Sequence, residues 1–440
     1  MKILTVIDTL KRGGRQRAAQ DYALGYLRAG HGSAVLAVTG GGPRAQVLRQ
    51  REVPVFIGGD DEAARAEAIR AAQAWQPDAV HLHSFGPPLP VMAEAIAHLK
   101  AALPAAPVLE TTSFGKVDYR QRYTLTDVHL LMTRWAFWRW QKWTRSLRLP
   151  PLGVVAPITA DPTSFYPVTA AERAAFRRTH GVPDDAFLFG RVGQPSVWKW
   201  DPVIFPAFAR VARRYPQSYL FLVGLPPELR PDLDALDASV RERIIEVPLL
   251  DGDAALRACY GALDVFLHAA RIGESFGLVL TEAMLCECPV VTLSTPARDN
   301  SQLEVVGHLR GGLVVNGEDG MVAAMTQLLR DEPLRRRLAE QGAEHVRSTL
   351  TLDHVVPALL RIIEMARAAP SRDALARALR AAPDLVTHVS DAEIVRRLHD
   401  TLDRVPRSHE LMMQLIHVPL VARLVWGAKA RLNRLRRGNA

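Results

Sequence analysis

The sequence predicts an α/β protein with parallel sheets, divided into two or three domains. Short apolar runs typical of buried parallel strands recur along the chain, and helical patterns separate them; residues 3–7 and the helical stretch that follows to residue 29 are the first such pair. Strands that alternate with helices build β-α-β units and parallel sheets. With 440 residues, the chain is too long for one ordinary domain.

The composition is that of a globular protein that meets anionic partners. It is 48% hydrophobic, enough to fill cores, and its formal charge is +9. An excess of cationic residues favours phosphates, nucleotides, nucleic acids or anionic lipids as partners. Nucleic acid is not expected, because the sequence contains no signature of a nucleic-acid-binding module. Three cysteines, Cys259, Cys286 and Cys288, are too few for a disulfide framework and are expected to be buried thiols.

The sequence also predicts a cytoplasmic protein. The apolar run at the N-terminus ends at Asp8, which is too early for a signal peptide. No apolar stretch is long enough to span a bilayer.

The N-terminal half reads as a series of βα units with polar residues at strand ends. Strands are expected over residues 3–7, 34–38, 53–57 and 78–84, a strand with its loop over 108–115, and a helix over 63–75. Gly13 and Gly14 form the loop between the first strand and its helix, where unpaired helix N–H groups can donate hydrogen bonds to a phosphate. His83 lies near the end of the strand over 78–84. Two roles are open: a structural hydrogen bond or contact with a ligand.

An aromatic and basic stretch over residues 134–143 allows two interpretations. A helix could bury Trp135 and Trp138 and leave Arg139 and Lys142 in water. Alternatively, tryptophans beside cations suit a membrane interface or a lipid-diphosphate acceptor.

The C-terminal half continues the same alternation. Strands are expected over residues 187–193, 219–224, 244–249, 264–270, 289–293 and 311–315, with helices over 256–263 and from 319 to 347. The run over 295–304 predicts a helix N-terminus capped by Asp299 or Asn300.

The chemistry is predicted to concentrate in residues 273–284, a loop that leads into a helix. Gly277 marks the expected helix start, where free N–H groups favour an anion. Glu274 precedes this anion site, and Glu282 follows Leu278 on the same helix face. Two carboxylates flanking an anion site suit a ligand with phosphates between two hydroxylated rings, such as a nucleotide-sugar.

Glu274 and Glu282 are eight residues apart, and Ala283, Met284 and a Pro-Val-Val run that begins at Pro289 follow them. This pattern resembles the donor-site signature of retaining glycosyltransferases of family 4, the group 1 glycosyltransferases. The resemblance covers roughly the first 365 residues. It implies the GT-B fold, in which two Rossmann-like doubly wound domains face a central cleft. The domains expected from it are an acceptor-side domain over 1–155, a donor domain over 165–350, a crossover helix over 351–368 and a helical basic extension over 369–440.

The resemblance also assigns roles in binding the donor. Glu274 is expected to bind sugar hydroxyls and Glu282 the ribose, and the backbone of Phe276, Gly277 and Leu278 to meet the sugar and the diphosphate. Pro248 is expected near the nucleobase. Gly13 and Gly14 resemble the family's glycine loop, which faces the donor phosphate and the acceptor.

Arg191 and Lys199 resemble the family's diphosphate-clamping pair, although the interval between them is longer than in many members. The leaving diphosphate gains negative charge as the sugar bond breaks, so fixed cations stabilise the transition state more than the ground state. With Glu274, these two cations are the predicted catalytic residues. Because they take the role of a cation, the resemblance implies no cofactor and no essential metal ion.

His83, Thr112 and Ser113 are expected on the acceptor side. Many family members have a histidine where this chain has Thr112 and Ser113, so the way the sugar is recognised differs here.

The sequence therefore predicts a retaining glycosyltransferase that moves a sugar from a nucleotide-diphosphate sugar to a glycan or lipid-linked hydroxyl acceptor, in polysaccharide or glycolipid biosynthesis. Two alternatives stay open. One is another GT-B enzyme, a sugar-nucleotide epimerase or a phosphorylase, although neither an acid/base set nor a pyridoxal lysine motif is recognisable. The other is a non-catalytic scaffold that binds sugar-nucleotides or glycans.

The last segment of the chain combines apolar and basic residues at helical spacing. The apolar residues are Val421, Leu424, Val425, Leu432 and Leu435. They are interspersed with a basic set comprising Arg423, Lys429, Arg431, Arg434, Arg436 and Arg437. A basic amphipathic helix can lie on anionic lipid, which would place the protein on the inner face of the plasma membrane. Packing of this helix on its own domain or on a partner subunit is an equal alternative.

Overall fold

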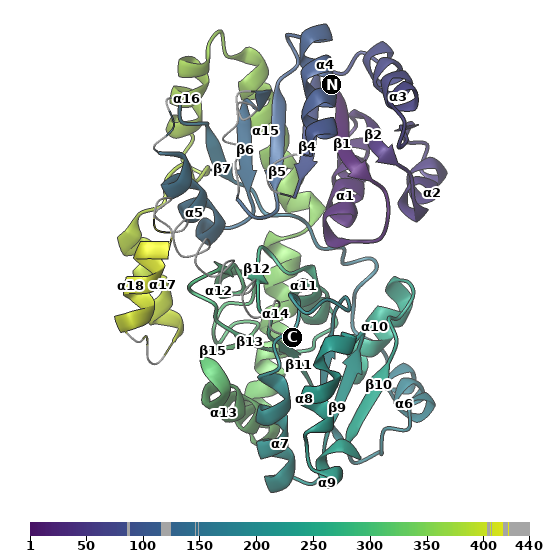
Figure 1. The fold of residues 1–440 in the computed structure, drawn as a ribbon, viewed down its shortest axis with the longest axis vertical. Coiled ribbons are helices and arrows are strands. Elements are labelled where there is room, and N and C mark those ends of the chain that lie inside the picture. The colour runs from purple at the N-terminus through teal and green to yellow at the C-terminus, as the bar shows by residue number, and fades with distance from the viewer. Residues whose placement is uncertain are drawn as a thin grey trace, which may run out of the picture. The chain divides into compact units, whose positions relative to one another are not determined.

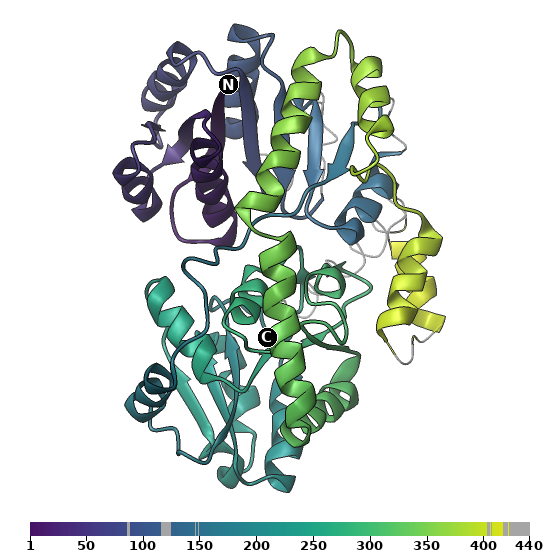
Figure 2. The same cartoon turned by 180° about the vertical axis from the view of Figure 1, so that it is seen from behind.

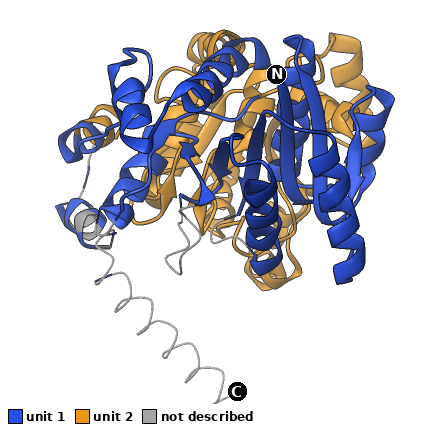
Figure 3. Cartoon of the chain, turned by 90° about the horizontal axis from the view of Figure 1, so that it is seen from above, with its two compact units in different colours: residues 1–159, 352–395, 405–440 blue, residues 160–351, 396–404 orange. Residues whose placement is uncertain are grey.

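The computed structural model describes residues 1–85, 89–115, 125–145, 147, 149–402, 405, 407–416 and 421. The chain forms two compact units (Figure 3). The first comprises residues 1–159, 352–395 and 405–440, and the second comprises residues 160–351 and 396–404. The first unit is therefore assembled from segments that are far apart in the sequence.

The first unit contains a parallel sheet of seven strands (Figure 1). Its strands are β1 (Lys2–Thr9), β2 (Gly32–Gly40), β3 (Val55–Ile57), β4 (Ala79–Ser84), β5 (Val108–Thr112), β6 (Val128–Leu131) and β7 (Gly153–Val155). The order β3-β2-β1-β4-β5-β6-β7 reverses direction between β1 and β4, as in Rossmann folds.

Helices cover both faces of this sheet. They are α1 (Gly14–Arg28), α2 (Pro43–Gln50), α3 (Glu62–Ala74), α4 (Pro90–Ala102), α5 (Arg134–Thr144), α15 (Leu352–Ala368) and α16 (Arg372–Ala381). Alternate residues of β1 explain the two layers. Leu4 and Val6 pack in a core with α3 and α4, whereas Ile7 packs in a core with α1 and α2. Apolar side chains on both faces are the mark of a buried parallel strand.

The helix that was predicted to cross back, α15, packs on α1 (Figure 2). The two helices meet at Gly25, where an added Cβ would lie 2.8 Å from Val356 Cγ2 and 2.9 Å from Leu352 Cδ2. A glycine is needed here because the helices approach too closely for a side chain.

The segment after α16 completes the first unit at β7 and α5. The backbone N–H of Val155 donates to the carbonyl of Val386 at 2.9 Å. The indole N–H of Trp138 donates to Asp391 Oδ1 at 2.6 Å, and Lys142 Nζ lies 2.9 Å from the same oxygen. Residues 386–391 thus cover the open edge of the sheet and one side of the aromatic helix.

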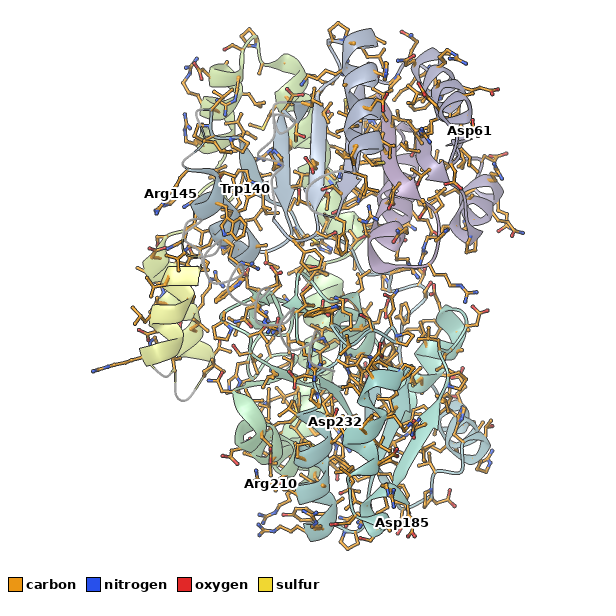
Figure 4. All side chains as sticks on the ribbon, viewed as in Figure 1. Asp61, Trp140, Arg145, Asp185, Arg210 and Asp232 are labelled. Atoms are coloured by element: carbon orange, nitrogen blue, oxygen red, sulfur yellow. The ribbon has the colours of Figure 1, made fainter. Side chains whose placement is uncertain are left out.

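These contacts decide between the two interpretations of the aromatic stretch. Trp135, Trp138 and Trp140 are all buried within the first unit (Trp140 is labelled in Figure 4). The expectation that Lys142 stays in water was wrong. Its ammonium is buried because Asp391, which comes from far along the chain, pairs with it, and no local pattern indicates that partner.

The second unit contains a parallel sheet of six strands in the order β10-β9-β8-β11-β13-β15. These strands are β8 (Phe187–Val192), β9 (Ser218–Val223), β10 (Ile244–Val247), β11 (Val265–His268), β13 (Val290–Leu293) and β15 (Gly312–Val315). Its helices are α6 (Ala170–Thr179), α7 (Ile204–Arg214), α8 (Arg230–Asp234), α9 (Ala238–Arg241), α10 (Asp253–Ala262), α11 (Leu278–Leu285), α12 (Gln302–Val305), α13 (Gly317–Arg330) and α14 (Glu332–Thr349). The strand order reverses between β8 and β11, so this unit is also Rossmann-like.

The predicted cap at Asp299 or Asn300 was wrong. These two residues form a short strand, β14 (Asp299–Asn300), that pairs in parallel with β12 (Gly273–Glu274). The side chain of Asn300 accepts a hydrogen bond from the backbone N–H of Thr295 at 2.8 Å rather than from a helix. Asx residues favour turns as well as caps, and the sequence alone does not show the pairing with β12.

The last two helices among the described residues are α17 (Asp391–Thr401) and α18 (Arg407–Ile416). The basic amphipathic segment predicted from residue 421 onward lies, apart from residue 421 itself, outside the described residues. Among the described residues, no helix combines the length and the apolar character needed to cross a bilayer.

We predict that Asp391→Ala lowers the free energy of unfolding. The substitution leaves the buried indole N–H of Trp138 without its acceptor, which costs on the order of 1–3 kcal/mol. Urea denaturation measures the change. The matched control is Asp384→Ala, which removes a carboxylate that pairs with Arg361 at the surface and should cost less than about 1 kcal/mol. Equal losses in the two variants would contradict the docking role of Asp391.

Candidate functional site

In the second unit, the predicted catalytic residues lie at or beyond the carboxyl ends of two neighbouring strands. Arg191 lies near the end of β8, and Lys199 lies in the loop that follows it. Glu274 lies in β12, six residues after the end of β11. Because the strand order reverses between β8 and β11, these residues occupy the position where open α/β sheets bind ligands.

Arg191 is held in a fixed orientation by its surroundings. Its side chain is buried, and its Nη1 and Nη2 donate to the carbonyls of Val192 at 2.7 Å and Lys199 at 2.6 Å. The guanidinium lies 5.0 Å from the ring centroid of Trp200. Burial lowers the pKa of Arg191 to about 10, so the group stays charged at neutral pH. Its buried Nε has no hydrogen-bond partner among the described residues.

Lys199 and Glu274 form an ion pair at the centre of the site. Lys199 Nζ lies 3.1 Å from Oε1 and 3.2 Å from Oε2 of Glu274. The carboxylate is buried, whereas the lysine is one-third exposed. Burial alone raises the pKa of Glu274, but Lys199 and His268 outweigh it, and the pKa is lowered to about 2. Glu274 is therefore an anion that can accept hydrogen bonds from hydroxyl groups.

His268, which sequence reasoning did not single out, holds Glu274 from the other side. Its Nε2 lies 3.4 Å from Glu274 Oε1, and its Nδ1 lies 3.0 Å from the hydroxyl oxygen of Thr292. Burial lowers the pKa of His268 to about 4, so the ring is neutral. A neutral ring that accepts from Thr292 donates to Glu274. The only sequence signal was a polar residue at the end of an apolar strand.

Two glycines shape the loop that carries Glu274. Gly273 has a φ of 76°, and an added Cβ would lie 1.9 Å from the carbonyl oxygen of Asp299. Gly277 has a φ of 90° and precedes the first residue of α11, Leu278. Both conformations favour glycine. Phe276, between them, is buried.

The start of α11 leaves helix N–H groups for a ligand. No side chain caps it, and its first turn contains no acidic residue. The N–H groups of a first turn have no partner within the helix and favour an anion. This is the position predicted to meet the sugar and the diphosphate.

The two remaining donor-side predictions fall on other elements of the second unit. Glu282 lies on α11, and the hydroxyl of Tyr260 donates to its Oε2 at 3.2 Å. Pro248 is exposed directly after β10. The structure thus brings Arg191, Lys199 and Glu274 together, and places Glu282 one helix turn beyond Leu278.

The first unit presents a second set of predicted residues where its own strand order reverses. Gly13 and Gly14 lie at the start of α1, after β1, and His83 lies near the end of β4. His83 is buried, and neither ring nitrogen has a hydrogen-bond partner among the described residues. Burial, His81 and Arg15 lower the pKa of His83 well below its usual value, so the ring is neutral.

Thr112 is the last residue of β5, which pairs with β4, and Ser113 follows it. The hydroxyl of Thr112 is buried without a hydrogen-bond partner in the part of the chain that the structure describes, and the N–H of Ser113 donates to the carbonyl of Ser84 at 3.1 Å. A buried carboxylate that the sequence did not indicate, Glu110, accepts from the hydroxyls of Ser84 at 2.6 Å and Thr126 at 2.8 Å. The acceptor-side roles stay predictions.

Within the described ranges, no group of three or more His, Cys, Asp or Glu side chains could hold a metal ion. The cations at the site are Arg191 and Lys199. The arrangement can therefore fix an anion between charged side chains and a helix N-terminus, beside a carboxylate that accepts from hydroxyls.

Comparison with known proteins agrees with this geometry. Residues 172–345 match the family described as glycosyl transferases group 1. A D-inositol 3-phosphate glycosyltransferase of Stackebrandtia nassauensis is 29% identical over 228 residues, which are 48% of each chain. A phosphatidyl-myo-inositol mannosyltransferase of Mycobacterium leprae is 32% identical over 168 residues, covering 36% of this chain and 41% of the relative. The matched region spans half or less of the length of these two relatives.

Solved structures are similar over most of the chain. The Anabaena protein Alr3699/HepE in complex with UDP-glucose is 18% identical, with a TM-score of 0.65 over 83% of this chain and 99% of that chain. Sucrose-phosphate synthase from Thermosynechococcus elongatus is 17% identical, with a TM-score of 0.65 over 84% of this chain and 100% of that chain. The predicted GT-B fold class, with two Rossmann-like halves and a helical C-terminal region, is confirmed, and residues 172–345 match the model of the group 1 glycosyltransferases.

We predict that Glu274 makes stability depend on acid pH. Its pKa is lowered from 4.5 to about 2 in the folded protein, so the stability it contributes is present above about pH 4.5 and is lost as the pH falls toward 2. The contribution is at most about 3 kcal/mol. Urea unfolding at several pH values should show that wild type and Glu274→Gln converge in this window.

Lys199→Met provides the matched control for this prediction. Without the ammonium, the pKa of Glu274 rises, so the acid-induced loss of stability should begin at a higher pH than in wild type. Parallel pH profiles for wild type and Glu274→Gln would show that the ion pair does not stabilise the fold.

Proposed function

We propose that the chain, whose residues 172–345 match the group 1 glycosyltransferases, transfers a sugar from a nucleoside-diphosphate sugar to a hydroxyl acceptor, with retention of anomeric configuration. The observation that carries the proposal is the convergence of Arg191, Lys199 and Glu274 at the start of α11. Two cations and a helix N-terminus suit a diphosphate, and the buried anion suits sugar hydroxyls. UDP and UDP-glucose are bound by the similar Anabaena protein, which supports a donor of this class.

In the proposed reaction, the bond between the anomeric carbon and the diphosphate oxygen breaks, and the leaving diphosphate takes the electron pair. Arg191 is fixed before this happens, so it stabilises the new charge without reorganisation. Each hydrogen bond to a charged group contributes on the order of 1.5–3 kcal/mol, and about 1.4 kcal/mol changes a rate tenfold. The acceptor hydroxyl adds to the same face of the sugar, and its proton passes to the leaving diphosphate.

Glu274 serves the other end of the proposed donor. It is ionised, and Lys199 and His268 hold it in one orientation. A hydroxylated sugar ring offers donors to such a carboxylate. In the free protein, Lys199 pairs with Glu274. A bound nucleotide-sugar would offer its sugar hydroxyls to the carboxylate of Glu274 and its phosphate oxygens to the ammonium of Lys199.

We place the acceptor in glycolipid or polysaccharide biosynthesis. The curated relatives carry names that refer to an inositol 3-phosphate and to a phosphatidyl-myo-inositol, and the net charge of +9 suits an acceptor or surface that carries phosphate. His83, Thr112 and Ser113 are the residues proposed to face it, because they lie at or directly after the ends of β4 and β5 in the first unit.

We predict that a nucleotide-sugar stabilises the wild type and is turned over, and that Glu274→Ala abolishes turnover. A thermal-shift screen of UDP-, GDP- and ADP-sugars identifies the donor, because binding to the folded state raises its apparent stability. Lys199→Met should lower the rate of donor turnover by a factor of tens, since it removes one cation from the diphosphate. Glu318→Ala, which removes a surface carboxylate that pairs with Arg210 (labelled in Figure 4), serves as the control and should keep full activity.

The same assay separates the competing functions. Magnetic resonance of the product distinguishes a retained from an inverted anomeric centre, and an epimerase would change the sugar without an acceptor. A scaffold would bind the donor without consuming it. The transferase assignment would be wrong if no nucleotide-sugar stabilised the protein, or if Glu274→Ala and wild type turned over the donor at the same rate.

We further propose that the protein contacts anionic membrane from the cytoplasmic side through its basic tail. Replacing Arg434, Arg436 and Arg437 with glutamine in the full chain should reduce co-sedimentation with vesicles that contain anionic lipid, because each cation near such a surface contributes about 1 kcal/mol. Substitution is preferable to truncation at residue 370, since residues 386–391 complete the first unit. Equal sedimentation of both proteins would discard the membrane role of the tail.

A further inference from the structure

Glu282, the carboxylate proposed to bind the ribose, has a buried phenol beside it. Tyr260 lies on α10, which packs against α11, and its side chain is fully buried. Its hydroxyl donates to Oε2 of Glu282 at 3.2 Å. The proposed transfer chemistry makes no use of this tyrosine.

The position of the Tyr260 hydroxyl is fixed by packing. The ring meets Phe266 edge to face, with centroids 5.4 Å apart, and lies against Phe165 with centroids 6.2 Å apart. Both neighbours are themselves buried, so the ring has no room to turn away. Burial and the charge of Glu282 raise the pKa of Tyr260 well above its usual value, so the hydroxyl keeps its proton and acts as a donor throughout the physiological range.

The thiol of Cys286 does not compete for this role. Cys286, one turn later on α11, is a buried thiol whose pKa burial raises to about 12, so it remains neutral and is a weak donor. Tyr260 is a stronger donor held on a separate helix, so its hydrogen bond ties the carboxylate of α11 to α10.

We propose that Tyr260 is a positioning residue for a ribonucleoside subsite: its hydrogen bond to Oε2 orients the Glu282 carboxylate toward both hydroxyls of a ribose. The inference rests on the proposed function, which makes the ligand a nucleoside diphosphate. A vicinal diol presents two donors at a fixed spacing, and a carboxylate accepts both only in one orientation. A site built to bind hydroxyls in this way discriminates against a ligand that lacks them.

The experiment compares wild type and Tyr260→Phe by titration calorimetry with UDP, GDP and ADP and with their 2′,3′-dideoxy analogues. Wild type should prefer the ribonucleotide that binds best over its dideoxy form. Tyr260→Phe should bind that ribonucleotide about three- to tenfold more weakly, as expected for the loss of one hydrogen bond, and should bind the dideoxy form as wild type does. Phenylalanine keeps the ring contacts with Phe266 and Phe165, so the fold should persist.

Two further variants test the pathway through Glu282. In Glu282→Gln the preference for ribose should fall, and adding Tyr260→Phe should cause little further loss, because both changes act on one interaction. Tyr26→Phe, which removes another buried hydroxyl that contacts His81 in the first unit, is the control and should leave nucleotide affinity unchanged.

The outcomes separate failure of this inference from failure of the proposed function. If wild type binds none of the three nucleoside diphosphates, the proposed function fails and the inference fails with it. If wild type binds one of them but Tyr260→Phe weakens the ribonucleotide and its dideoxy form equally, or weakens neither, Tyr260 only packs the helix and the positioning role is overturned.

Discussion

The second unit depends on keeping one carboxylate charged while it is buried. A buried anion is costly unless it is paired and hydrogen-bonded. Glu274 meets both conditions, because Lys199 contacts both of its oxygens and a neutral His268 contacts one of them. The loop that carries it then needs Gly273, whose conformation lets β12 lie against β14. Much of the local backbone thus follows from placing one acid.

Arg191 extends the same principle to the cationic side. Its guanidinium is buried, but two backbone carbonyls and the face of Trp200 compensate for the lost water. The carbonyl of Lys199 is one of its two acceptors, so the arginine that is fixed and the lysine that pairs with Glu274 are mechanically linked. A group that is already oriented needs no rearrangement when charge appears beside it, which is the physical basis of electrostatic preorganisation.

Most of the fold was predictable because its strands and helices follow from local patterns of apolar and polar residues. Apolar runs indicated the six strands of the second sheet and β1 to β5 of the first, but β6 and β7, which are only four and three residues long, were not predicted. The Gly277 start of α11 was visible as a glycine between a strand and a helix. The site was predictable in part, because the spacing of Glu274 and Glu282 resembles a known signature. His268 and Tyr260 were missed because their importance comes from contacts across the tertiary structure. Asp299 and Asn300 were misassigned because the same residue types serve caps, turns and short strands.

The first unit is closed by a segment that lies more than two hundred residues after its own sheet. Val386 supplies the carbonyl that completes the edge of β7, and Asp391 receives the indole of Trp138. On the ribosome, residues 160–351 form most of the second unit and emerge before these partners exist. The first unit, whose sheet is translated first, is therefore completed only after the second unit has been synthesised. Until then, the tryptophans of α5 lack the partners that cover them and are exposed to aggregation with other chains.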